Sequence, residues 1–365
     1  SEAWAPSPWT IPSHFAMLTG VDPWRVPFDA AARRFVEKRP MLAERLHRLG
    51  YSAAAILANL TLAPESGFAG GYDEFTTSRG SAVCRSALGD LLNRLWLHGL
   101  PPSPVCGSLL AGDVTSRALH FIGRAQRPYF LTLNYMDAHA PYYVPSDCRP
   151  ANDRMLTASE RVAFAGRRST PEIDRRVHDQ YRLAMRCMDR SLGKLFDAVA
   201  RDPDAGKTIV IVAGDHGEQF GELGKTGHGN SVFPPVLRVP LILHIPNETA
   251  RQVETTVSTT GIHPTLLKLL EPNRSVERSL LDPSNGRPAV SFFAAHGESA
   301  FSGAENGLEL IRNASGTETL LTEQGLARVD VQTQPAFVAK ARNFLAAAMG
   351  AQRGSGEFRS VGYLN

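Results

Sequence analysis

The chain has 365 residues, of which 43% are hydrophobic and 21% are charged, and its formal net charge is +3 at pH 7. This composition is that of a globular protein with enough apolar side chains for one large core, with or without a second, smaller unit. The Lys and Arg residues form no run, which argues against nucleic acid or an anionic membrane as the partner.

The first ten residues have no basic start and no apolar core, so we expect no signal peptide there. No stretch of about 18 apolar residues is present, and we expect no membrane span. The four cysteines (Cys84, Cys106, Cys148 and Cys187) lack a metal-binding spacing. One or two disulfides are possible, but we expect buried free thiols, and the compartment stays open.

Helix and strand patterns alternate through most of the chain. Amphipathic helices are predicted over residues 41–50 and 173–199. Strands are predicted over 51–59, 127–136, 207–215 and 239–246. The run 207–215 is continuously apolar, as in a strand covered on both faces. We therefore predict an α/β fold over residues 1–271, with a doubly wound, mainly parallel sheet flanked by helices.

The pattern changes at residue 272, where Pro, Asn and Gly residues predict a linker. Beyond it, short strand-like runs are found at 289–295, 308–314, 318–323 and 327–331, followed by a helix near 335–350. We predict a small C-terminal α+β subdomain over residues 272–365, with antiparallel strands and a terminal helix.

Two histidine-containing clusters follow predicted strands. Asp215 and His216 begin a glycine-rich loop that also contains His228, and an oxygen ligand beside an imidazole suits a divalent cation. Asp137 and His139 follow the strand 127–136 and point to the same side if the segment is extended. Each cluster by itself is equally typical of a polar turn or of a loop histidine with satisfied hydrogen bonds.

A third candidate is Thr10, at the start of a predicted helix. By itself it reads as a helix-entry residue, but a bound metal can activate its hydroxyl as a nucleophile. Ligands of doubly wound sheets lie beyond the carboxyl ends of the strands, where we expect all three clusters to meet. A hydroxyl, two histidine clusters and a glycine-rich loop are what a metal-assisted displacement at phosphorus or sulfur requires.

The pattern resembles the sulfatase and alkaline-phosphatase superfamily, in its sulfatase-like branch. The matching segments, in chain order, are TIPSHFAMLTG (10–20), LAERLHRLGYSAAAILAN (42–59), MDAHAPY (136–142), YRLAMRCMDRSLGKLFDAV (181–199), GDHGEQFGE (214–222), GHG (227–229), RVPLILHIP (238–246), HPTLL (263–267) and FRSVGYLN (358–365). The resemblance implies an alkaline-phosphatase-like fold and a divalent metal, zinc or manganese first, with magnesium or calcium also possible.

The resemblance also implies roles for individual residues. Thr10 would be the nucleophile and would bind one metal together with Asp215 and His216. His139 and His228 would hold the anionic oxygens of the substrate or a second cation. Weaker substrate-binding candidates are Lys225, His14 and Asp137. The substrate would be a small anionic ester or a lipid or glycan headgroup.

Three departures from the family pattern bear on the reaction. Thr10 stands where sulfatases carry the Cys or Ser that becomes formylglycine, and threonine cannot give that aldehyde. His14 replaces the arginine of the motif, and residues 58–64 contain neither the Lys nor the His typical of arylsulfatases. Relatives with Thr there act on phosphoric esters through a phosphothreonine, so we predict a hydrolase or phosphotransferase of that kind. A sulfuric ester hydrolase and a non-catalytic or truncated family member are the alternatives.

The family's first strand is a further departure. In relatives it precedes the nucleophile motif and ends in an acidic metal ligand, whereas only residues 1–9 precede Thr10 here. We therefore expect the first strand and its ligand to be missing from this chain. Thr-nucleophile relatives often follow membrane helices and face outside, which favours a periplasmic or extracellular location over a cytoplasmic one. The oligomeric state is left open.

Overall fold

The structure is a computed structural model of the chain, and it describes residues 3–29, 33–78, 109–150, 154–166, 168–282, 288–295, 298–322 and 326–354. Cys84, Cys106 and the family-like chain end at 358–365 lie outside these residues. Among the residues described, no helix is both long and apolar enough to span a membrane.

Three parallel strands, in the order β5-β4-β6, form one part of the central sheet. They are β4 (Ser52–Leu57), β5 (Glu74–Thr77) and β6 (Tyr129–Asn134). Residues 53–57 of β4 are all buried, which confirms the predicted buried strand. Its run of alanines leaves room for helices to pack closely on both faces.

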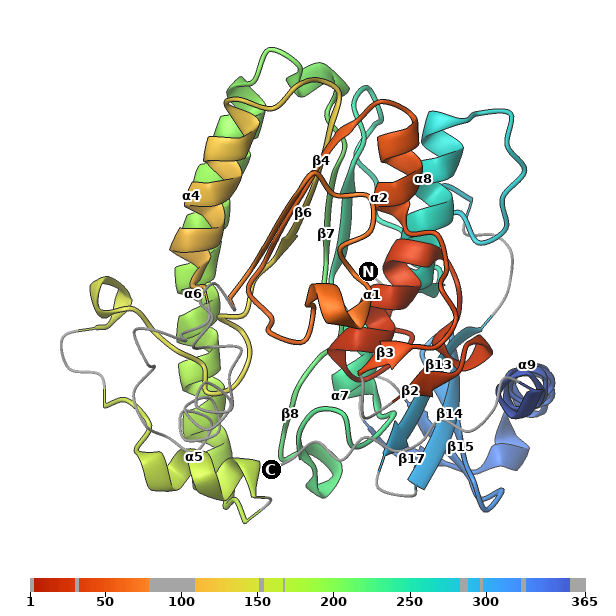
Figure 1. Cartoon of the computed structure of the whole chain (residues 1–365). Helices are drawn as coiled ribbons and strands as arrows, with labels where there is room; N and C mark the ends of the chain where they lie inside the picture. The colour runs from red at the N-terminus through yellow and green to blue at the C-terminus, as the bar shows by residue number, and fades with distance from the viewer. Residues whose placement is uncertain are drawn as a thin grey trace.

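Helices cover both faces of these strands (Figure 1). On one side lie α4 (Ala111–Ile122) and α6 (Pro171–Arg201), and Val114 and Ala118 of α4 pack against Ile56. On the other side lie α1 (Thr10–Thr19), α2 (Leu42–Arg48) and α8 (Ile262–Leu270). This layering confirms the predicted α/β fold and the long helix expected over 173–199.

A separate two-stranded sheet pairs β7 (Val210–Ala213) antiparallel with β11 (Leu241–His244). The prediction that β7 is buried on both faces is wrong, because all four of its residues are only half-buried. Within the described residues β7 bonds to β11 alone and β6 to β4 alone. Each strand therefore has one edge without a strand partner in the described part of the chain.

The C-terminal part is a five-stranded antiparallel sheet in chain order, on which α9 (Pro335–Gly354) packs. Its strands are β13 (Ala289–Ala295), β14 (Glu298–Glu305), β15 (Leu308–Asn313), β16 (Glu318–Thr322) and β17 (Arg328–Val329). Only β14 has no counterpart among the predicted strands. Its small residues hide the strand pattern, yet Gly303 is where Leu345 and Ala341 of α9 lie against the sheet.

The C-terminal sheet also fixes the segment that leads to Thr10. The Ser291 hydroxyl donates to the Ala5 carbonyl at 2.7 Å, and the Phe292 N–H donates to the Pro6 carbonyl at 3.0 Å. The remaining elements are β1 (Ala3–Trp4), β2 (Phe28–Asp29), β3 (Arg34–Phe35), β8 (Gln219–Phe220), β9 (Thr226–Gly227), β10 (Arg238–Val239), β12 (Val257–Ser258), α5 (Ala158–Ala165) and α7 (Pro234–Leu237).

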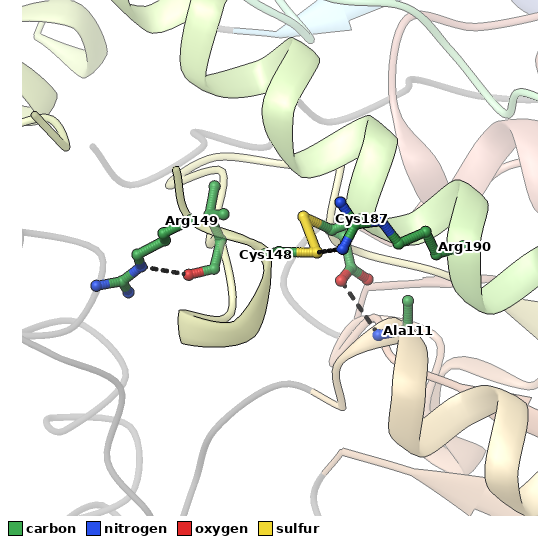
Figure 2. Close-up of a disulfide and its surroundings, with 7 residues drawn as sticks. Ala111, Cys148, Arg149, Cys187 and Arg190 are labelled. Carbon is green, nitrogen blue, oxygen red and sulfur yellow. Dashed lines mark hydrogen bonds between the residues drawn. A yellow bond between two sulfur atoms is a disulfide. The ribbon is translucent and has the colours of Figure 1, made fainter. Parts of the chain in front are cut away.

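A disulfide joins Cys148, in the loop that follows His139, to Cys187 of α6 (Figure 2). The expectation of free thiols is therefore wrong for these two residues. The cysteines are 39 residues apart in sequence, and the fold brings their Cα atoms to 6.0 Å, within the range of a disulfide. Spacing along the chain carried no sign of this pairing.

Candidate functional site

The predicted site residues lie where the carboxyl ends of the strands meet the start of α1. Thr10 is the first residue of α1 and is only 1% exposed. His139 follows β6, and Asp215 and His216 follow β7. The topology therefore brings together three segments that are far apart in sequence, as expected for a doubly wound sheet.

The Thr10 hydroxyl lies beside the Asp215–His216 pair. Its Oγ1 is 3.4 Å from His216 Nε2, and that nitrogen is 3.6 Å from Asp215 Oδ2. His14, one helical turn after Thr10, has its Nδ1 3.0 Å from the Thr10 carbonyl oxygen and 3.5 Å from Asp215 Oδ2. Thr10, Asp215 and His216 are thus adjacent, and His14 contacts the same carboxylate.

Asn59, which the sequence analysis missed, also contacts the hydroxyl. Its side-chain amide donates to Thr10 Oγ1 at 3.2 Å. Its carbonyl oxygen accepts from the backbone and the hydroxyl of Thr61, and its own backbone N–H donates to Asn134 Oδ1 at 2.9 Å. These bonds fix the amide's orientation. In the sequence, the signal that could have pointed to Asn59 was its position just after the buried strand β4.

His139 and His228 lie next to each other and next to His216. Ring centroids are 4.9 Å apart for His139 and His228, and 4.3 Å apart for His216 and His228. On its other side, His228 contacts Glu218, a carboxylate that the sequence analysis did not single out. The distance from His228 Nδ1 to Glu218 Oε1 is 3.0 Å. The Gly229 N–H donates to the Pro8 carbonyl at 2.9 Å, which ties this loop to the segment before Thr10.

Backbone carbonyls orient two of the three rings. His139 Nδ1 is 2.7 Å from the Ala140 oxygen, and His216 Nδ1 is 2.8 Å from the Gly217 oxygen. A carbonyl oxygen can only accept, so Nδ1 carries the proton in both rings. When these rings are neutral, Nε2 presents a lone pair, which is the form that binds a metal or accepts a proton.

The charges of this cluster follow from burial and from mutual contact. Burial, followed by the neighbouring His228, lowers the pKa of His139 to about 4. Burial also lowers the pKa of His216, against the opposing charge of Asp215. For Asp215 burial alone would raise the pKa, but His216, His14 and His228 outweigh it, and the pKa is lowered. Near neutral pH the site thus contains a carboxylate and two neutral imidazoles.

Glu218 and His228 behave as an ion pair. Burial acts against both charges, yet the contact between them lowers the pKa of Glu218 and raises that of His228. The cluster therefore places a cationic ring beside a neutral one. This arrangement suits an anionic ligand.

Two predicted residues lie apart from these contacts. Asp137 is 3% exposed and accepts from the Ala111 N–H, at the start of α4, at 3.1 Å. Burial raises its pKa to about 6. Lys225 lies in the turn between β8 and β9, and within the described residues no contact joins its side chain to the cluster. Asp137 thus fixes a helix start, and the placement of Lys225 adds no support for substrate binding.

The predicted metal ligands fit a cation in kind and spacing. Donors on one zinc ion are about 3.4 Å apart in tetrahedral geometry, close to the 3.4 and 3.6 Å found among Thr10, His216 and Asp215. However, within the described ranges no group of three or more His, Cys, Asp or Glu side chains is arranged to hold a metal. The donor set is therefore one conventional ligand short of a usual site.

Comparisons with known proteins identify the family of the chain. The sulfatase family model matches residues 1–272. The uncharacterized sulfatase YidJ of Escherichia coli (strain K12) is 25% identical over 179 residues, covering 44% of this chain and 36% of that protein. The match thus spans well under half of the relative's own length.

Two solved structures have a similar fold. Ps i-CgsB, in complex with k-i-k-neocarrahexaose, has a TM-score of 0.67 at 15% identity and covers 99% of this chain and 86% of its own. Phosphonate monoester hydrolase of Agrobacterium radiobacter has a TM-score of 0.64 at 16% identity, with coverages of 97% and 88%. At these identities the likeness concerns the fold.

Proposed function

The chain belongs to the sulfatase family, and on that basis we propose that it is a metal-dependent hydrolase or transferase of phosphoric esters with Thr10 as its nucleophile. The observation that carries the proposal is the position of the Thr10 hydroxyl. It lies at the start of α1, 3.4 Å from His216 Nε2 and 3.2 Å from the Asn59 amide. A likeness in fold to a phosphonate monoester hydrolase supports chemistry at phosphorus.

Each neighbour of Thr10 has a distinct task. The Asn59 amide donates to Oγ1 and fixes the direction from which the oxygen approaches phosphorus. Asp215, His216 and Thr10 would hold the cation, which when bound lowers the pKa of the hydroxyl and neutralises charge on the ester. The start of α1 adds a positive dipole end toward an anionic group.

The histidines beyond Thr10 would serve the ester. As the bond from Oγ1 to phosphorus forms, the hydroxyl proton of Thr10 is lost to water, the bond to the leaving oxygen breaks, and that oxygen needs a proton. The cationic His228 can supply one, and the neutral His139 beside it can accept a proton at Nε2. Water or an acceptor alcohol would then release the phosphoryl group from Thr10.

Sulfate esters are the second candidate, because the chain belongs to a family named for them. Against this reading, an unmodified threonine cannot form the formylglycine on which sulfatases rely. We therefore place phosphoric esters, including those of lipid or glycan headgroups, ahead of sulfuric esters.

The metal site needs another acidic ligand, and we propose that a further strand, outside the residues that the structure describes, brings it. Strands β6 and β7 each have one edge without a strand partner among the described residues. Every residue of both strands is only half-buried. A strand between them would satisfy those edges and bring a ligand to the same end of the sheet.

The deciding experiment measures bound metal and ester turnover on the same preparation. We expect zinc or manganese, lost in Asp215→Ala, and turnover of a phosphodiester that Thr10→Ala abolishes. Thr19→Ala is the matched control, because Thr19 lies at the far end of α1 and its hydroxyl donates to the Phe15 carbonyl. Mass spectrometry should find the phosphoryl group on Thr10.

Other outcomes would contradict parts of the proposal. Turnover of a sulfate ester alone would move the assignment to the sulfatase reading. Neither metal nor turnover, even with excess metal, would support a non-catalytic family member. If a peptide carrying an acidic strand restored both metal binding and turnover, the proposal that a further strand brings the acidic ligand would stand.

A further inference from the structure

The hairpin β8–β9 places a carboxylate directly opposite a histidine of the site. Gln219 pairs with Gly227 and Phe220 with Thr226 in antiparallel register. Extending this register by one residue sets Glu218 opposite His228, at the open end of the hairpin. Cross-strand neighbours of this kind have side chains within direct contact.

The contact between these side chains is close and buried. His228 Nδ1 is 3.0 Å from Glu218 Oε1, and both side chains are 8% exposed. A carboxylate can only accept here, so Nδ1 carries the proton. Nε2 is the ring nitrogen that Glu218 does not engage, and the same ring contacts His139 and His216.

We propose that Glu218 is a positioning residue, which holds the Nδ1 proton of His228 and thereby sets the ring so that Nε2 faces the ester. An imidazole in water rotates freely and exchanges its proton between both nitrogens. A buried carboxylate fixed by a hairpin removes both freedoms. The inference rests on the proposed function for its consequence in catalysis, although the ring geometry can be tested without any activity.

The first test determines which ring nitrogen of His228 carries the proton. Nitrogen NMR of the histidine-labelled whole chain, at a pH high enough to make His228 neutral, should show the single ring proton of His228 on Nδ1. Glu218→Gln keeps a carbonyl oxygen in place and should retain that state, whereas Glu218→Ala should move the proton to Nε2. A neutral ring with its proton on Nε2 in the unaltered protein, or no change in Glu218→Ala, would overturn the proposal whatever the enzyme does.

The second test measures kcat and KM. Glu218→Ala should lower kcat about 10- to 100-fold with little change in KM, and Glu218→Gln should keep most of the rate. Glu222→Gln is the matched control, since Glu222 lies in the same hairpin and its side-chain Oε2 accepts from the Phe220 N–H at 2.5 Å. Equal losses in the two Glu218 variants would overturn the positioning role, whereas an unaltered protein without turnover would count against the proposed function alone.

Discussion

The side-chain amide of Asn59 donates a hydrogen bond of 3.2 Å to the hydroxyl of Thr10, across 49 residues of chain. The bond links the end of strand β4 to the start of α1. It also gives the nucleophile a fixed direction, because the other polar groups of Asn59 are already bonded to Thr61 and Asn134.

Replacing Asn59 should therefore affect the rate more than binding. We expect Asn59→Ala to lower kcat by about two orders of magnitude while KM changes little, because the hydroxyl loses its orientation. Steady-state kinetics on a phosphodiester would measure this. Asn230→Ala is the control, since the Asn230 amide donates to the Thr226 carbonyl, and a similar loss there would argue against a specific role for Asn59.

Gly217 is required by the packing of the loop that carries Asp215 and His216. A Cβ at Gly217 would overlap the carbonyl oxygen of Pro235, which cannot move without shifting α7. Gly217→Ala should lower the free energy of unfolding by about 1–3 kcal/mol and weaken metal binding. Denaturant unfolding and elemental analysis would measure the two effects.

A second glycine provides the comparison. Gly193 lies inside α6, and a Cβ there would meet nothing within 4 Å. Gly193→Ala should stabilise the protein by about 0.5–1 kcal/mol. If both alanine variants behaved alike, the packing argument for Gly217 would be wrong.

The disulfide between Cys148 and Cys187 should contribute to stability through the unfolded chain. It closes a loop of 39 residues, for which chain entropy gives an upper value of about 4 kcal/mol. Replacing both cysteines with serine should lower the free energy of unfolding by about 2–4 kcal/mol. Unfolding with and without a reductant would test this, and a reductant should destabilise the serine variant far less.

His263 should make the protein less stable in mild acid. Burial, followed by the positive charges of Arg45 and Arg274, lowers its pKa to about 4. The unfolded chain therefore takes up this proton at higher pH than the folded one, and stability falls as the pH drops from about 6.5 toward 4. The loss by pH 4.5 is about 2–3 kcal/mol.

The variant His263→Leu isolates this contribution from other titrating groups. It cannot take up a proton, so its unfolding free energy should fall less between pH 7.5 and 4.5 than that of the unaltered protein. Denaturant unfolding at the two pH values gives the difference. Identical pH profiles would show that His263 protonates equally in both states.

Local sequence determined most of the secondary structure. The apolar run 51–59 predicted β4, and helical spacing of apolar residues predicted α6 to within two residues at each end. The failures have two different causes. In β14 small residues hide the strand pattern, and the half-buried state of β7 depends on what lies at its second edge.

The candidate site also contains residues that the sequence predicted and partners that only the tertiary structure showed. Residue types and short spacings pointed to Thr10, Asp215, His216, His139 and His228, because the chemistry of each is a property of its own side chain. Only the tertiary structure showed the partners Asn59 and Glu218 and the disulfide between Cys148 and Cys187. A hydrogen bond or a disulfide depends on distance and direction between side chains, and these are set by how strands and helices pack, which spacing along the chain does not encode.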